Sequence, residues 1–412
     1  MDVIVVGAGK AGSLHYRAYS RLARAGRLDP ARIQFVDHAG RAGRELAALL
    51  AADALPERVV QSRAQVAGTP PESTIVDLCL PSRDLAPALV EWWRAGYRKF
   101  VVEKPFLVPP DLAGEVGRVL ASSSAVLVRN YLHSRVHRTV RELVARYDLA
   151  PLLCVTNFSK DRRADSRRRR GASGSGSPTV FEVEIPHQLY IGADLIGEVR
   201  SLDHVDETAL AGDDGERLRL GEGVLLGRAA SGASFIHYSN LRHPTIVRSL
   251  DLFCRDQLSV HATYTPICEE FADIKAGVIL SRGDTVLAKH LFTEDDNMLA
   301  MISHAFETLS GTTGGRVDLE DVLRDNAVIA SAVEGTPFRL RAPATARTDA
   351  LQQWVVSSFR MGLEAGIGRS FLEHLEHCRR ERLTEVLPAL APSAARLPAQ
   401  AETGAVREGA LV

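Results

Sequence analysis

The strongest constraint on the fold is a glycine-rich turn near the start of the chain. A short apolar run leads into it, the glycines have the spacing G-x-G-x-x-G, and a helix-compatible stretch follows. In such a strand–turn–helix unit the glycines allow a tight turn, close approach of a pyrophosphate and close helix packing, and the helix N-terminus stabilises the anion. We assign cofactor binding to five residues of this turn: Gly7, Gly9, Lys10, Ala11 and Gly12.

Strand-like and helix-like stretches then alternate up to about residue 130. The expected strands are 3–6, 32–36, 73–80, 100–102 and 125–129, and the expected helices are 13–25, 42–52, 85–95 and 111–121. Strands that are apolar throughout are typical of a parallel sheet covered by helices on both faces. Residues 1–130 are therefore predicted to form an α/β Rossmann dinucleotide-binding domain.

The pattern changes after about residue 150. Strands are expected at 152–159, 217–226, 233–240, 249–254 and 257–263, with helices at 186–196, 298–309 and 319–333. This predicts an α+β domain with a large, mainly antiparallel open sheet over residues 131–335, closed by the last two helices. An amphipathic helical extension is expected at 336–390, and 391–412 lacks periodicity and is expected to be a disordered tail.

Composition excludes several function classes. A net charge of -1 gives no overall field that would attract nucleic acid or an anionic membrane, so neither is expected as a partner. No apolar run approaches the ~20 residues of a membrane helix. The five cysteines are scattered without Cys-x-x-Cys spacing, which favours a reducing cytoplasmic location and no structural metal site.

One carboxylate follows the second expected strand. Asp37 lies about 25 residues after Gly12, near the distance at which a carboxylate hydrogen-bonds the adenosine ribose. A carboxylate there repels a ribose phosphate, so NAD is favoured over NADP. Arg41 and Arg44 lie just beyond and would suit a ribose phosphate, which keeps NADP as an alternative.

A lysine stands in the sequence Glu103-Lys104-Pro105, directly after another expected strand of the same sheet. The carboxyl ends of parallel strands border the ligand crevice. A lysine there can polarise a substrate oxygen or stabilise an alkoxide. Lys104 is therefore a candidate catalytic residue, although a single lysine is more often a solvated surface charge.

Several motifs together resemble the Gfo/Idh/MocA family of sugar and cyclitol dehydrogenases. They are the glycine turn with His15 three residues after it, Leu80-Pro81-Ser82 at the end of the third strand, and Val101-Val102-Glu103-Lys104-Pro105. The resemblance covers roughly residues 1–335. It implies that Pro81, Ser82, Glu103 and Lys104 line the cofactor site, that Lys104 contacts the substrate, and that the second-domain sheet forms a homodimer or homotetramer.

The resemblance also implies an acid/base histidine on the first helix of the second domain, which falls on His187. A neutral imidazole can accept a hydroxyl proton, and activity is expected to rise through its titration near pH ~6.5. The family usually has an aspartate four residues earlier, where this chain has Val183. Glu184 is the nearest carboxylate that could orient the histidine, and a structural core histidine is the alternative.

A strongly basic segment precedes this helix. Residues 160–178 contain seven lysine or arginine residues and two aspartates, followed by a Gly/Ser-rich run. One interpretation is a solvated insertion, and the other is a loop that folds over an anionic substrate such as a nucleotide sugar or sugar phosphate.

The function expected from these features is reversible hydride transfer between NAD(P) and a secondary alcohol or ketone of a sugar, nucleotide sugar or cyclitol. Two alternatives stay open: an NADPH-dependent imine reductase of the same family, and a non-catalytic dinucleotide-binding sensor. Retention of both Lys104 and His187 favours an enzyme.

Overall fold

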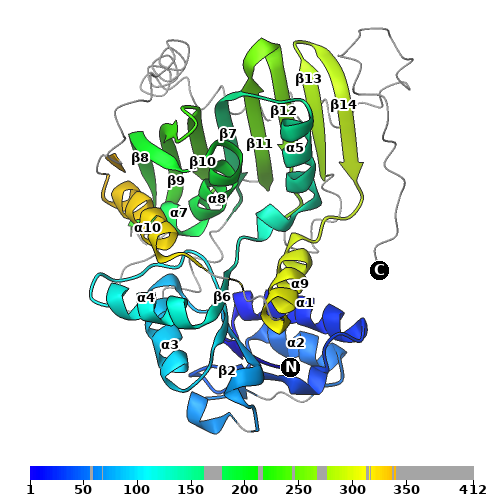
Figure 1. The fold of residues 1–412 in the computed structure, drawn as a ribbon, viewed down its shortest axis with the longest axis vertical. Helices are drawn as coiled ribbons and strands as arrows, with labels where there is room; N and C mark the ends of the chain where they lie inside the picture. Colours follow the sequence, from blue (N-terminus) through cyan, green and yellow to red (C-terminus); the bar gives the residue numbers. More distant parts are fainter. Residues whose placement is uncertain are drawn as a thin grey trace.

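Two β-sheets with their own helices make up the described part of the molecule (Figure 1). The computed structural model describes residues 1–55, 59–66, 68–161, 179–211, 217–243, 246–266, 276–311, 315, 317–335 and 338–339. The predicted C-terminal extension and tail, apart from residues 338–339, and nearly all of the basic segment lie outside these residues.

The first sheet has six parallel strands in the order β3-β2-β1-β4-β5-β6, which confirms the predicted Rossmann arrangement. Its strands are β1 (Asp2–Val6), β2 (Ile33–Val36), β3 (Val59–Val60), β4 (Thr74–Leu78), β5 (Lys99–Val102) and β6 (Ser124–Leu127). The two-residue β3 was not predicted. Its helices include α1 (Lys10–Arg24), α2 (Arg44–Ala52), α3 (Ser82–Arg94) and α4 (Ala113–Ser122).

Alternation along β1 explains the two covered faces of this sheet. Val3 and Val5 belong to the apolar cluster that includes residues of α1 and α2, whereas Ile4 and Val6 belong to the cluster that includes residues of α3 and α4. Because successive side chains point to opposite faces, one apolar strand serves both layers.

The second sheet has nine strands in the order β14-β13-β12-β11-β7-β10-β9-β8-β15. All neighbouring pairs are antiparallel except β7 with β10, as the prediction of a mainly antiparallel sheet required. The strands are β7 (Pro151–Ser159), β8 (Val199–Ala211), β9 (Arg217–Ala229), β10 (Ser234–Asn240), β11 (Val247–Cys254), β12 (Leu258–Thr263), β13 (Ala276–Arg282), β14 (Thr285–Phe292) and β15 (Phe338–Arg339).

Helices α5 (Arg135–Arg146), α7 (Val180–Val183) and α8 (Ile185–Ile196) lie against one face of this sheet. Helix α5 and strands β8, β13, β14 and β15 were not predicted. Strand β8 lies near the edge of the sheet and contains four charged residues, and β14 has no buried residue, so neither carries a strong apolar signal.

The two closing helices do not both belong to the second sheet. Helix α9 (Asn297–Ser310) packs against α1, and its Met301 and Ile302 are part of a first-sheet cluster. Helix α10 (Leu319–Glu334) bridges the two sheets, because Val322 packs with the first core and Val328 with the second. The prediction that both helices close the second domain was therefore wrong for α9, while α10 contributes to the cores of both sheets.

Two further observations concern expectations from composition. No helix among the described residues is long and apolar enough to cross a membrane. Cys79, Cys154 and Cys254 are buried free thiols, while Cys268 and Cys378 lie outside the described part of the chain.

Candidate functional site

The glycine turn joins β1 to α1. Two of its glycines are closely packed against other backbone atoms, and the third has open space around it. Gly7 has φ +104°, and a Cβ there would lie 2.5 Å from the carbonyl oxygen of Cys79. A Cβ at Gly12 would lie 2.0 Å from the carbonyl oxygen of Gly7. Around Gly9, by contrast, none of the described residues comes within 4 Å of the Cβ position. Gly7 and Gly12 are thus required by packing, whereas Gly9 faces space at the N-terminus of α1, where an anion would be stabilised.

Asp37 lies beside this turn, as expected. One carboxylate oxygen accepts the Ala8 N–H at 2.9 Å, and the other accepts the Ala39 N–H at 2.9 Å. Each oxygen keeps a further lone pair for a ribose hydroxyl. Arg41 and Arg44 are exposed on the segment that returns to the turn, so the geometry accommodates either predicted cofactor.

The Glu103-Lys104-Pro105 segment leaves β5 at the same edge of the sheet. The Glu103 N–H donates to the Leu78 carbonyl at 3.1 Å, which places it beside the end of β4. The next residues of that neighbouring strand lead to Pro81 and Ser82, at the start of α3. The structure therefore brings the predicted cofactor residues, which follow the ends of β1, β2, β4 and β5, to one edge of the sheet.

Lys104 reaches from this edge to the second half of the chain. Its Nζ donates to the carbonyl oxygen of Val183 at 3.2 Å. The helix is interrupted at that point: Pro186 has no N–H, and the His187 N–H donates to the Glu184 carbonyl at 3.2 Å. The residue that replaces the family's aspartate thus contacts Lys104 through its backbone.

His187 lies nearby, at the start of α8, and is 6% exposed. Its ring packs edge-on against Tyr131 at a centroid distance of 5.0 Å. Burial, followed by the positive charge of Lys104, lowers the pKa of His187 well below 6.5. The imidazole is therefore neutral at physiological pH, and the expectation of a titration near pH ~6.5 is replaced by a lower one.

Glu184 does not orient His187 in the expected way. Its buried carboxylate pairs with Arg248 at 3.0 Å and with Lys160 at 3.5 Å, and no hydrogen bond joins it to the His187 ring among the described residues. Arg248 Nε in turn donates to the Tyr131 hydroxyl at 3.1 Å. The Glu184 carboxylate acts on the His187 ring through its charge, which raises the pKa of His187 and offsets part of the effect of burial.

Arg248 and Tyr131 were not predicted. A charged residue inside the apolar strand β11 was the available signal for Arg248, because a buried charge needs a partner. Tyr131 carried no comparable signal, since an aromatic residue in a short connection is ordinary.

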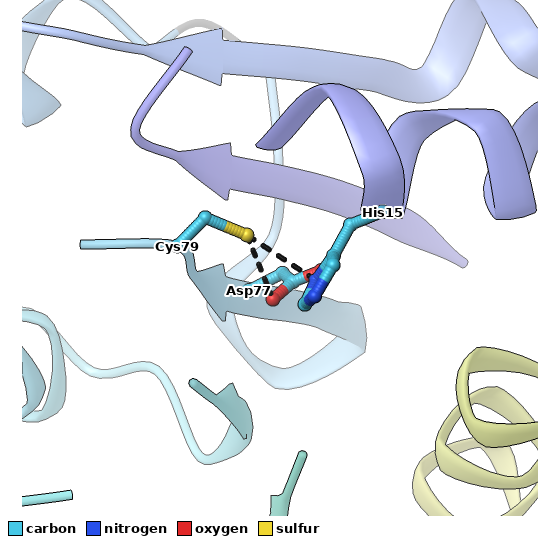
Figure 2. A group of neighbouring side chains, drawn as sticks. All are labelled: His15, Asp77 and Cys79. Carbon is cyan, nitrogen blue, oxygen red and sulfur yellow. Dashed lines mark hydrogen bonds and ion pairs between the residues drawn. The ribbon is translucent and has the colours of Figure 1, made fainter. Parts of the chain in front are cut away.

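A buried polar cluster lies between α1, which begins at the glycine turn, and the ends of β4 and β5. His15 on α1 contacts Asp77 on β4 through Nδ1 at 2.8 Å and Glu103 through Nε2 at 2.9 Å. The Cys79 thiol lies 3.2 Å from the same Nδ1, and Figure 2 shows His15, Asp77 and Cys79 converging. These three residues are also the one group of potential metal ligands among the described residues, although no metal site was expected.

Comparisons with known proteins support the fold. No protein-family model matches the sequence, and no curated protein is significantly similar to it. Among solved structures, an NAD-binding oxidoreductase from Klebsiella pneumoniae is 16% identical, with a TM-score of 0.61 over 83% of this chain and 100% of that one. At this identity the likeness establishes the two-domain fold alone.

Two other structures bear names that indicate substrates. The 3-ketoreductase KijD10 from Actinomadura kijaniata, in complex with NADP and TDP-benzene, is 14% identical with a TM-score of 0.61, over 82% of this chain and 98% of that one. The UDP-N-acetylglucosamine 3-dehydrogenase GnnA from Acidithiobacillus ferrooxidans is 15% identical with a TM-score of 0.57, over 82% and 97%.

Proposed function

We propose that this chain is an NAD(P)-dependent oxidoreductase acting on a secondary alcohol or ketone. The main support for the proposal is a contact between the two halves of the chain. Lys104 follows β5 at the same sheet edge as the glycine turn, and its ammonium group donates to the Val183 carbonyl, four residues before His187. A cation and a neutral base therefore stand together at the expected dinucleotide site.

The two side chains divide the acid/base work. In alcohol oxidation, His187 accepts the hydroxyl proton, because its lowered pKa leaves the imidazole unprotonated. Lys104 stabilises the developing alkoxide by charge and hydrogen bonding. A bound nicotinamide would supply the hydride acceptor or, in the reverse direction, the donor.

The residues around the turn fit a dinucleotide. The open space at Gly9 and the N-terminus of α1 suit a pyrophosphate, and Asp37 suits the ribose hydroxyls. We expect NAD(H) to be preferred, since Asp37 repels a ribose phosphate. Arg41 and Arg44 are the residues that would support NADP(H).

The substrate proposed is a sugar, a nucleotide sugar or a cyclitol. The structurally similar KijD10 and GnnA carry names that refer to a TDP ligand and a UDP-sugar, which supports testing nucleotide sugars first. Lys104, Lys160 and Arg248 each lower the pKa of His187, so the site carries positive charge that would favour an anionic substrate.

A turnover screen tests this function. Wild-type protein is incubated with NAD⁺ or NADP⁺ and a panel of nucleotide sugars, sugar phosphates and cyclitols, and nicotinamide absorbance is followed. At least one compound is expected to give turnover that Lys104→Ala abolishes. Imines are tested separately, as substrates for reduction by NADPH. If the protein binds the cofactor but turns over neither the panel compounds nor the imines, the sensor alternative is favoured.

We also propose self-association through the second sheet. This proposal follows from the resemblance to the Gfo/Idh/MocA family, since the apolar cluster that Leu153 and Val155 form with residues of β9 and β10 is already buried within one chain. Light scattering of the purified chain is expected to give the mass of a dimer or tetramer, and a monomer at all concentrations would contradict this. A cytoplasmic location also stays a prediction.

A further inference from the structure

Asp77 is a carboxylate inside the core of the first sheet. It lies in β4 between Val76 and Leu78, and all three side chains are fully buried. A buried charge is costly unless it is paired and hydrogen-bonded. Two side chains from α1 supply these contacts: His15 Nδ1 at 2.8 Å and the Tyr19 hydroxyl at 3.0 Å.

The same imidazole contacts a second carboxylate. His15 Nε2 lies 2.9 Å from Glu103 Oε1, while Glu103 Oε2 accepts the backbone N–H of Lys104 at 2.9 Å. A neutral imidazole has a single N–H and cannot donate to two ionised carboxylates. With both carboxylates ionised, the two contacts are satisfied together only when His15 carries two protons.

Electrostatics agree with this protonation state. Burial alone would lower the pKa of His15, but the charge of the Asp77 carboxylate opposes this, and the net pKa is raised well above 6.5. Burial raises the pKa of the Cys79 thiol, so that group stays protonated. The cluster then has two negative charges and one positive charge, next to the Lys104 segment.

We propose that His15 is a positioning residue: as a buried imidazolium it holds the Glu103 carboxylate, and through it the backbone of Lys104, against the helix that carries the glycine turn. His15 lies three residues after Gly12, so this clamp ties the cofactor turn directly to the catalytic lysine. The catalytic consequence rests on the function proposed above, whereas the clamp itself does not require turnover.

A metal is the competing occupant of the cluster. Nδ1 of His15, a carboxylate oxygen of Asp77 and the sulfur of Cys79 lie within 4.8 Å of one another. A zinc-bound histidine would also donate its other N–H to a carboxylate such as Glu103. The two possibilities differ in protonation. Zinc binding would remove the proton from His15 Nδ1 and from the Cys79 thiol, whereas both protons are present in the metal-free cluster.

The clamp is tested first on the protein without substrate. With ¹⁵N-labelled histidine, both ring nitrogens of His15 are expected to stay protonated as the pH rises past ~6.5, where an ordinary histidine loses a proton. With ¹⁵N-labelled lysine, the chain gives only six backbone amides, and the Lys104 amide is expected to be protected from exchange by its bond to Glu103. An unprotonated His15 nitrogen, or about one zinc ion per chain in the purified protein, would overturn the proposal.

Variants separate positioning from simple stability. Glu103→Ala and His15→Gln are each expected to lose the Lys104 amide protection, and the pair His15→Gln with Asp77→Asn keeps the buried charge balanced in case the single variant does not fold. Tyr19→Phe is the matched control, because it removes a hydrogen bond to the same Asp77 without touching Glu103. It is expected to retain the protection.

Kinetics complete the test once a substrate is found. His15→Gln and Glu103→Ala are each expected to lower kcat about tenfold or more, and the double variant is expected to be no slower than the worse single variant, because both act through one contact. Additive losses, or a lower melting temperature with unchanged kcat and retained Lys104 protection, would show that His15 is only structural. If no substrate is found, the labelled-amide result still decides the clamp, independently of the proposed function.

Discussion

Alanine at Gly9 and at Gly12 is expected to have opposite effects, although both glycines belong to the same motif. Gly9 has φ −84°, which alanine adopts freely, and its Cβ would meet none of the described residues within 4 Å. Gly9→Ala should therefore leave the free energy of unfolding unchanged or raise it by ~0.5 kcal/mol, because the unfolded chain becomes less flexible. The new methyl group would occupy the space of the pyrophosphate, so the Kd for NADH should rise at least about tenfold, or ~1.4 kcal/mol.

Gly12→Ala places a Cβ 2.0 Å from the Gly7 carbonyl oxygen, a backbone atom that cannot rotate away. The helix must shift from the strand, at a cost of about 1–3 kcal/mol or more in the free energy of unfolding. Urea unfolding measures the stabilities, and fluorescence titration with NADH measures the affinities. Destabilisation of Gly9→Ala rather than Gly12→Ala would contradict the packing roles assigned to these glycines. NADH binding by Gly9→Ala as tight as that of the wild type would contradict a pyrophosphate site at Gly9.

Three further results are expected. Lys104→Ala should abolish turnover while the Kd for NADH changes less than about tenfold in calorimetry, and a retained kcat would remove Lys104 from the mechanism. His187→Asn should lower kcat by about 10²-fold or more, and the wild-type acidic limb should lie below pH ~6.5, since the pKa of His187 is lowered by burial and by Lys104; a limb above that pH would contradict the assignment. Burial lowers the pKa of His237 to about 3, so below pH ~6.5 the unfolded state binds a proton that the native state does not. The free energy of unfolding should thus fall by ~2 kcal/mol between about pH 7 and pH 5. His237→Gln should reduce this loss when thermal unfolding is measured at each pH, and an unchanged pH dependence of stability in the variant would contradict the prediction.

Local patterns in the sequence were sufficient for the glycine turn and for every strand of the first sheet except the two-residue β3. The strands there are continuous apolar runs, and each functional segment follows directly from a strand end, as with Glu103 and Lys104 after β5. Parallel strands bring their carboxyl ends to one edge, so topology alone places these residues together. The histidine at 187 came from the family resemblance rather than from a pattern of its own.

Long-range partners could not be read in this way. His15 meets Asp77 and Glu103 across 62 and 88 positions, and Glu184 takes Arg248 from a strand that lies well beyond it in the sequence. Its spacing from His187 suggested that Glu184 would hydrogen-bond the imidazole. Instead the helix is interrupted near Pro186, and the Glu184 carboxylate pairs with Lys160 and Arg248. Charge pairing depends on which buried groups the tertiary fold brings together, and a single sequence does not report this.

Calorimetric titration of the purified chain with NAD⁺, NADH, NADP⁺ and NADPH decides whether the protein binds a nicotinamide cofactor. We expect saturable binding of at least one reduced dinucleotide, about one molecule per chain, with NADH preferred and the affinity weakened in Gly9→Ala. If none of the four dinucleotides binds to the folded wild-type protein, the chain is not a nicotinamide-dependent oxidoreductase.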